Sequence, residues 1–162
     1  MKNIAVSIGI SAIWLVSLLP LSVAHALGAL IGKILWLTNS KALKITKINL
    51  RICFPDYRDD EINNLAKKSL SALGKTYAEM GMSWMWPIPK VHKLITQVEG
   101  EEYLQQALKD KNGIILIAPH LGNWEILNHF FRTYLYMTVM YKKVNIPKLD
   151  KFIFNTRKRV DV

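Results

Sequence analysis

The sequence predicts an α/β protein, with an N-terminal membrane helix followed by a partial, mostly parallel αβα domain. An apolar stretch runs from Ile4 to Leu37, and Lys33 is its only charged residue. The second half alternates short, continuously apolar runs with segments of helical periodicity. Such alternation is typical of βαβ units, whose parallel strands are buried on both faces.

The length and composition fit one domain with an appended segment. Of the 162 residues, 51% are hydrophobic, which excludes a disordered chain. We expect three parts: a hydrophobic membrane anchor over 1–37, a basic membrane-proximal connector over 38–57 and the folded domain over 58–162. Cys53 is the only cysteine, so an internal disulfide is excluded and a small buried side chain is expected.

The apolar stretch is longer than the ~20 residues that a helix needs to cross a bilayer. Pro20, Gly28 and Gly32 interrupt it, so it predicts either one kinked span or a span followed by an interfacial helix. A cleaved signal peptide is the alternative, because "VAHA" at 23–26 resembles a cleavage site. The apolar character continues beyond that site, which favours the anchor.

The segment after the anchor is basic. From Lys33 onward, near the end of the anchor, five basic residues appear before Asp56, the first acidic residue: Lys33, Lys41, Lys44, Lys47 and Arg51. This flank is expected to stay on the cytoplasmic side, where it contacts anionic headgroups or forms a solvated basic face. The net charge of +10 favours anionic partners. No nucleic-acid-binding motif accompanies the charge, so no nucleic-acid partner is expected.

A long amphipathic helix is predicted next. Asp59 or Asp60 suits its first turn, and apolar residues recur at helical spacing up to Trp84. The helix is expected to end between Gly81 and Pro87, in an aromatic, proline-bearing loop.

The remaining chain predicts alternating elements. Strands are expected over "KLITQVEG" (93–100), "IILIA" (114–118) and "MTVMY" (137–141). Helices are expected over "EEYLQQALKDKNG" (101–113), from near Trp124, and over "PKLDKFIFNTRKR" (147–159).

The run "IILIA" ends in a cluster of polar residues. In open parallel sheets, ligands bind beyond the carboxyl ends of the strands, where His120 is expected. Gly122 permits a tight turn and Asn123 suits a helix cap. His120 and Glu125 can then converge across the junction, so that Glu125 holds the imidazole while its other nitrogen takes a proton from a hydroxyl.

Two alternatives compete with a catalytic pair. In the first, His120 is a structural histidine at the end of a strand. In the second, His120, Glu125 and His129 bind a metal, since Glu125 and His129 share a helix face. No second ligand cluster accompanies them, so we expect no metal.

"HLGNWE" (120–125) resembles the H-x-x-x-x-E signature of the bacterial lipid A late acyltransferases, the lauroyl and myristoyl transferases. "NLRICFPD" (49–56), "GIILIAPHLGNWE" (113–125) and "YKKVNIPKLDKFIFNTR" (141–157) resemble further family segments. The resemblance spans nearly the whole chain. It implies a glycerolipid-acyltransferase-like domain on the cytoplasmic face of the bacterial inner membrane.

The resemblance also implies the chemistry. A fatty acyl chain moves from an acyl carrier protein thioester to a hydroxyl of a lipid A precursor, and no other cofactor is needed. His120 is implied as the general base and Glu125 as its partner. Asn123, Lys142 and Arg157 are implied to bind substrate. Acyl carrier protein, the precursor glycolipid and inner-membrane lipids are the implied partners.

The sequence departs from the family at two points. Lys142 stands where arginine is common, and lysine lacks bidentate geometry toward phosphate. Family members continue well beyond Val162, so the chain is expected to be an N-terminal, truncated part that lacks full activity. A non-catalytic membrane-anchored remnant, or acylation of another glycolipid or a lysophospholipid, is the alternative.

Overall fold

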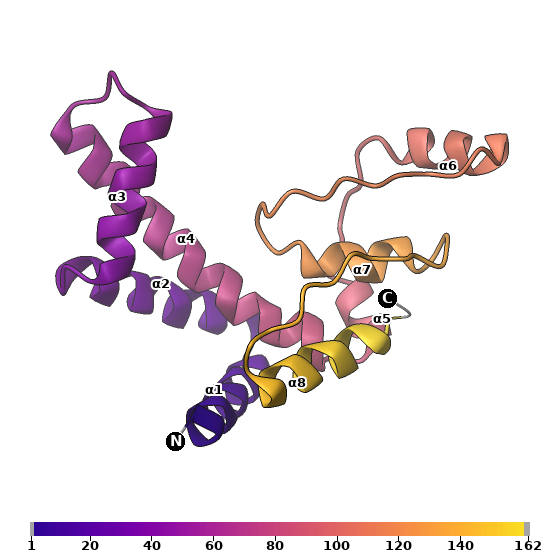
Figure 1. The fold of residues 1–162 in the computed structure, drawn as a ribbon, viewed down its shortest axis with the longest axis horizontal. Helices are drawn as coiled ribbons and strands as arrows, with labels where there is room; N and C mark the ends of the chain where they lie inside the picture. The colour runs from indigo at the N-terminus through magenta and orange to yellow at the C-terminus, as the bar shows by residue number, and fades with distance from the viewer. Residues whose placement is uncertain (1, 161–162) are drawn as a thin grey trace. The chain divides into compact units, whose positions relative to one another are not determined.

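The computed structural model describes residues 2–160, and every regular element in that range is an α-helix (Figure 1). The chain forms two compact units, one ending at Met85 and the other beginning at Trp86. The first unit contains α1 (Lys2–Ser17), α2 (Leu21–Leu37), α3 (Lys41–Cys53) and α4 (Asp59–Met85). The second contains α5 (Ile88–His92), α6 (Glu101–Asp110), α7 (Glu125–Phe131) and α8 (Pro147–Lys158).

The apolar N-terminal stretch is divided at Pro20, one of the three expected interruptions, and the single N-terminal membrane helix of the predicted fold class does not form within residues 2–160. Pro20 is the N-cap of α2 and has extended dihedral angles, φ −56° and ψ 146°. Proline has no backbone N–H and disfavours helical geometry in the residue before it, so α1 ends and α2 restarts here.

No single helix in residues 2–160 is both long and apolar enough to cross a membrane. Among the helices of the described residues, only α2 and α3 taken together are long and apolar enough, and the pair is bent by 84°.

Two glycines bring α2 and α4 into close contact. A Cβ on Gly28 would lie 2.5 Å from the carbonyl oxygen of Gly74, and a Cβ on Gly32 would collide with the carbonyl of Leu70. The register runs antiparallel, since Gly28 meets Gly74 and the later Gly32 meets the earlier Leu70. His25 and Glu79 extend it with a contact of 2.6 Å between Nε2 and Oε1. Small residues therefore let the two backbones approach closely, as in GxxxG helix pairs.

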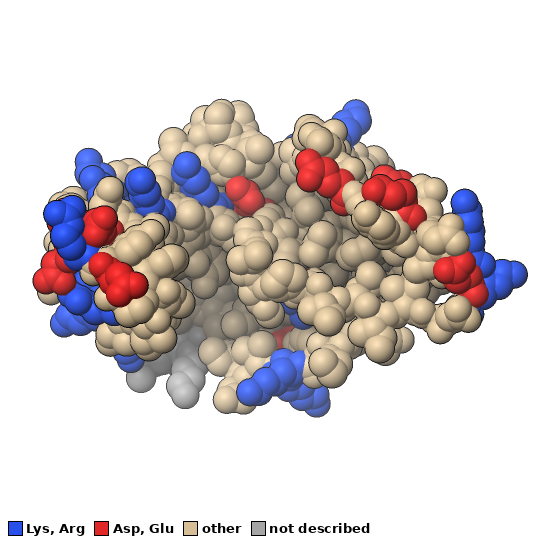
Figure 2. All heavy atoms as spheres, turned by 90° about the horizontal axis from the view of Figure 1, so that it is seen from above, with Lys and Arg blue, Asp and Glu red and all other residues tan. Residues whose placement is uncertain are grey.

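The basic connector contains a helix that the sequence analysis missed. Ser40 caps α3 by accepting a hydrogen bond from the Leu43 amide at 3.2 Å. Leu43 then packs with Ala66 and Leu70 of α4 in a buried cluster. Figure 2 shows lysine and arginine side chains gathered with acidic ones over α3 and the start of α4. Cys53 is exposed at the end of α3, so its predicted burial is wrong.

Most predicted helices are confirmed. The long amphipathic helix is α4, which begins at Asp59 as expected. Helices α6, α7 and α8 begin at Glu101, Glu125 and Pro147. The short helix α5 replaces part of the predicted aromatic loop, and it begins directly after Pro87.

The predicted parallel sheet is wrong, because no strand forms anywhere in residues 2–160. Residues 93–95 instead continue the turn after α5, where the Ile95 amide donates to the His92 carbonyl. Residues 114–118 and 137–141 are not helical and do not pair. Ile115 is 93% exposed and Met140 is 99% exposed. An apolar run becomes a buried strand only when a neighbouring strand and covering helices bury it, and the described residues provide neither.

Candidate active site

His120 lies in the turn between the non-helical run 114–118 and α7. The Leu121 amide donates to the Pro119 carbonyl at 2.8 Å, and Gly122 has φ +56°, a left-handed conformation that glycine adopts readily. The predicted tight turn is therefore present. His120 is exposed, and its ring lies 4.5 Å from that of Trp124, centroid to centroid.

Glu125, the first residue of α7, is 3% exposed. Its carboxylate binds Arg157 of α8, with Nη2 to Oε1 at 2.5 Å and Nε to Oε2 at 3.4 Å. Asn128 donates a further hydrogen bond to Oε2 at 3.3 Å. The buried charge therefore has a forked cationic partner, which a carboxylate removed from water requires.

The structure brings Glu125 to Arg157 and not to His120. Within residues 2–160, no hydrogen bond joins His120 to Glu125. Arg157 was expected to meet substrate, yet its guanidinium is engaged by protein, with 24% of the side chain exposed. This arrangement fixes the start of α7, and with it the turn that bears His120, to α8.

The residues before and within α8 form a second hydrogen-bonded group. Tyr141 donates through its hydroxyl to Asp150 Oδ1 at 2.6 Å, and the Val144 amide donates to the same oxygen at 2.9 Å. These bonds lower the pKa of Asp150, and the Tyr141 bond is the larger cause. The same bond raises the pKa of Tyr141.

Arg157 links the two groups. Its guanidinium carbon lies 5.8 Å from the centre of the Tyr141 ring, in cation–π range. Asp150 and Arg157 are seven residues apart, which is two turns of α8, so both lie on one face. Pro147 suits the first position of α8, because its fixed φ fits a helix start. The local sequence of α8 therefore positions the side chains of Asp150 and Arg157 for these contacts.

Two further predicted site residues are Lys142 and Asn123. Lys142 is exposed. Asn123 is half-buried, and the N-cap position of α7 belongs to Trp124, so the prediction of Asn123 as the cap is wrong.

His129 follows Glu125 by one turn, is 3% exposed, and its ring centre lies 6.5 Å from that of His92. In residues 2–160, no three His, Cys, Asp or Glu side chains are grouped to hold a metal. The arrangement gives the metal alternative no support.

Sequence reasoning missed the Glu125–Arg157 pair. Thirty-two residues separate its members, and no periodicity connects two helices across such a distance. The Tyr141–Asp150 bond is closer in sequence, and its one local signal is an acidic residue in the first turn of α8.

Comparison with known proteins identifies the family. The chain matches the family described as bacterial lipid A biosynthesis acyltransferase over residues 1–162. It is 32% identical over 119 residues to the lipid A biosynthesis lauroyltransferase of Escherichia coli K12, an alignment covering 74% of this chain and 39% of that enzyme. It is 30% identical over 118 residues to the palmitoleoyltransferase of the same organism, covering 73% and 38%.

A lipid A biosynthesis acyltransferase of Haemophilus influenzae is 34% identical over 82 residues. No solved structure shows a significant match. The chain thus spans less than two fifths of the length of the E. coli enzymes that it matches. Since the family match covers all of its residues, the chain belongs to the bacterial lipid A biosynthesis acyltransferase family.

Proposed function

We propose that this chain carries the general base of an acyl transfer from an acyl carrier protein thioester to a hydroxyl of a lipid A precursor. The observation that carries the proposal is the placement of His120. Its side chain is exposed in a tight turn directly before α7. The first residue of α7, Glu125, is bound by Arg157. An exposed imidazole on a fixed turn is accessible to two large substrates.

The reaction balances with His120 as the only proton carrier. One ring nitrogen accepts the proton of the acceptor hydroxyl while its oxygen attacks the thioester carbonyl carbon. The carbon–sulfur bond then breaks, an ester remains on the acceptor, and the leaving thiolate takes the proton from the imidazolium.

Glu125 is proposed as the partner of that imidazolium when substrates are bound. Catalytic hydrogen bonds are often long without substrate and tighten in the complex. Until then, Arg157 orients the carboxylate through its two hydrogen bonds. Arg157 is thus a positioning residue in this proposal. Asn123 lies within "HLGNWE" (120–125) and Lys142 lies within the segment 141–157, and both are proposed to contact substrate.

The proposed location is the cytoplasmic face of the bacterial inner membrane. Helices α1 and α2 expose large apolar side chains, among them Ile8 at 65%, Leu15 at 57% and Ile31 at 54%. Lipid is a chemically suitable cover for such a surface. A membrane-held chain would meet its amphiphilic acceptor there, and the net charge of +10 suits an acidic carrier protein.

The test is transfer of radiolabelled laurate from acyl carrier protein to a tetra-acylated lipid A precursor, in membranes containing this chain. The proposal is supported if His120→Ala abolishes transfer while Lys109→Ala, a control that removes an exposed charge, retains it. Absence of transfer by the unaltered chain would contradict it and favour the non-catalytic alternative.

A further inference from the structure

A groove of about 340 Å³ lies between α2 and α4 in the first unit. The two helices lie side by side (Figure 1), and their backbones approach closely at Gly28 and Gly32. The volume lies at the small end of the range for small-molecule sites, which suits a small group or one end of a longer molecule. Six residues line the groove: Ala26, Ala29, Leu30, Lys33, Lys67 and Ser71.

Helical spacing explains this lining. The four residues from α2 recur at intervals of three or four and therefore share one face of that helix. Lys67 and Ser71 are one turn apart on α4 and share a face in the same way. Ala26 and Ala29 are small, so they leave space beside the contact between the two helices that larger side chains would fill.

One end of the groove is cationic. In the antiparallel register of the two helices, Lys33 lies at a level between Lys67 and Ser71. Both lysines are exposed, and Lys67 Nζ lies 5.1 Å from the centre of the Trp36 ring, in cation–π range. This contact holds the Lys67 ammonium beside α2, so both charges lie at the same end of the groove.

No acidic residue of α2 or of the facing part of α4 neutralises this end. Helix α2 contains none, and α4 contains none between Glu61 and Glu79. Glu61 pairs with Arg58, and Glu79 contacts His25. Two like charges in one groove repel each other, and an anion bound between them removes that repulsion.

The other end of the groove is apolar. Ala26 precedes Lys33 by seven residues, which places it roughly 10 Å away along α2. Leu30 is 52% exposed, and the neighbouring Val23 and Leu27 are 43% and 38% exposed. A ligand that matches both ends carries a negative charge at one end and hydrocarbon at the other.

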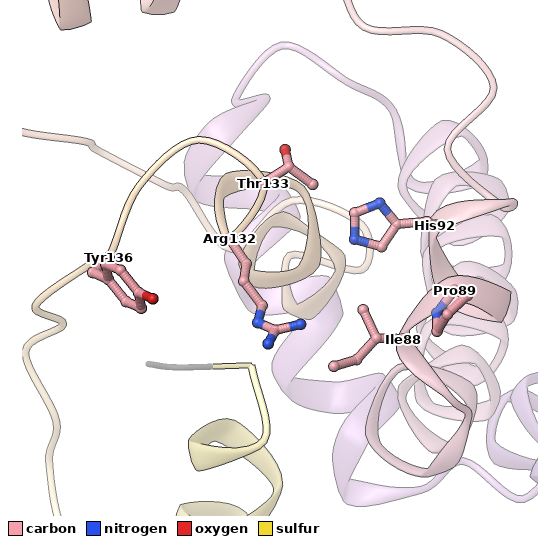
Figure 3. A pocket seen from close by; sticks show the side chains of 6 residues that line it. All are labelled: Ile88, Pro89, His92, Arg132, Thr133 and Tyr136. Atoms are coloured by element: carbon pink, nitrogen blue, oxygen red, sulfur yellow. The ribbon is translucent and has the colours of Figure 1, made fainter.

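A cavity of about 360 Å³ in the second unit is a weaker candidate for an anionic ligand (Figure 3). Its only permanently charged lining residue, Arg132, already has an interaction within the protein. The two lysines of the groove therefore offer the better anion site. The residues that line the second cavity are Ile88, Pro89, His92, Arg132, Thr133 and Tyr136.

We propose that the groove between α2 and α4 binds a phospholipid with a net negative headgroup. The ammonium groups of Lys33 and Lys67 donate charge-assisted hydrogen bonds to the phosphate oxygens, and the Ser71 hydroxyl donates a third bond. One acyl chain lies over Leu30 and the two alanines. Basic pockets between membrane helices bind anionic headgroups in this way. The bound lipid is not the acyl acceptor, and its binding does not depend on acyl transfer.

The experiment measures lipid binding to the purified chain in maltoside detergent, by native mass spectrometry. Three probes are titrated: dioleoyl phosphatidylglycerol, dioleoyl phosphatidylcholine and glycerol 3-phosphate. Phosphatidylcholine keeps the phosphate and both acyl chains but adds a cation that the lysines repel. We therefore expect it to bind at least fivefold more weakly than phosphatidylglycerol. Glycerol 3-phosphate lacks acyl chains, and we expect it to show no saturable binding.

Variants test the two ends of the groove. Lys33→Gln and Lys67→Gln are each expected to weaken phosphatidylglycerol binding at least threefold, and the double variant at least tenfold. Lys68→Gln is the matched control, because Lys68 is an exposed lysine of α4 that does not line the groove, and affinity should not change. Ala26→Leu places a larger side chain in the apolar end and should weaken binding severalfold. Melting temperatures without lipid verify that each variant is folded.

The proposal is overturned if phosphatidylglycerol binds no more tightly than phosphatidylcholine. It is also overturned if Lys68→Gln weakens binding as much as Lys67→Gln, because any surface charge would then suffice. Glycerol 3-phosphate that binds as tightly as the lipid would show a site for free phosphate, and dimers without lipid would show that a second copy covers the groove. Either result contradicts the proposal. His120→Ala should abolish transfer and retain lipid binding, so failure of one proposal is distinguishable from failure of the other.

Discussion

Arg157 holds the buried carboxylate of Glu125 through two guanidinium nitrogens, at 2.5 and 3.4 Å. This ion pair joins α8 to the first residue of α7, directly beyond the turn that carries His120. The Glu125 side chain is 3% exposed, so water and salt screen the attraction between the carboxylate and the guanidinium only weakly.

Removal of one partner from this pair should destabilise the second unit. Arg157→Ala leaves a buried carboxylate without its cation, which costs about 3 kcal/mol. Arg157→Lys should recover part of that loss. The measurement is urea unfolding, followed by a double-mutant cycle with Glu125→Gln. Additive losses in the cycle would show that the two side chains do not interact.

The close approach of α2 and α4 predicts a contrast between two glycines. Gly74→Ala places a Cβ against the Gly28 carbonyl, and the atoms that it meets there are all backbone atoms, so no flexible side chain can move aside. Overpacking of this kind costs about 1–3 kcal/mol. Gly9→Ala in α1 meets nothing within 4 Å, so higher helix propensity should stabilise it by up to about 1 kcal/mol. Thermal unfolding in detergent compares the two, and equal melting temperatures would contradict the packing.

The Tyr141–Asp150 hydrogen bond predicts a pH window. The pKa of Asp150 is lowered, so its contribution is present above the unfolded value of about 3.9 and is lost as pH falls through the lower folded pKa. The pKa of Tyr141 is raised, so its contribution is present below about 10 and is lost as pH rises through the higher folded pKa.

Hydrogen exchange of the Val144 amide, which donates to Asp150, measures this window. Protection is expected between about pH 4 and pH 10. Asp150→Asn removes the acidic titration and should remove the acid limb of the profile. An acid limb that survives Asp150→Asn would mean that another group controls it.

The exposure of residues 114–118 predicts unequal sensitivity of two isoleucines. Ile117 is 89% exposed and Ile62 is fully buried in α4. Ile62→Ala should therefore cost about 2–5 kcal/mol, whereas Ile117→Ala should change stability by less than about 0.5 kcal/mol. Chemical denaturation of both variants measures the two changes in the free energy of unfolding. A cost for Ile117→Ala near that for Ile62→Ala would mean that the segment is buried in solution.

Sequence alone predicted the elements with local signals. Helix α4 follows acidic residues that favour its first turn, and α8 begins at Pro147. Helix α3 also had a signal, the Ser40 cap followed by Leu43, but the basic residues around it suggested a connector. The missing strands show the limit of apolar patterns, because pairing depends on neighbours distant in the chain.

The candidate site was predicted in part. The tight turn at Gly122 follows from glycine chemistry and is present. The contact of Glu125 with Arg157 joins residues far apart in the sequence, so it required the three-dimensional arrangement. The roles of His120 and Glu125 in transfer stay predictions.

The most direct measurement of the central claim is the rate of carrier-protein-dependent acyl transfer by His120→Ala, Glu125→Gln and the double variant. Two residues that act as one catalytic unit give non-additive losses. We therefore expect the double variant to be no slower than His120→Ala alone. Retained transfer in His120→Ala, or losses that multiply in the double variant, would contradict the account.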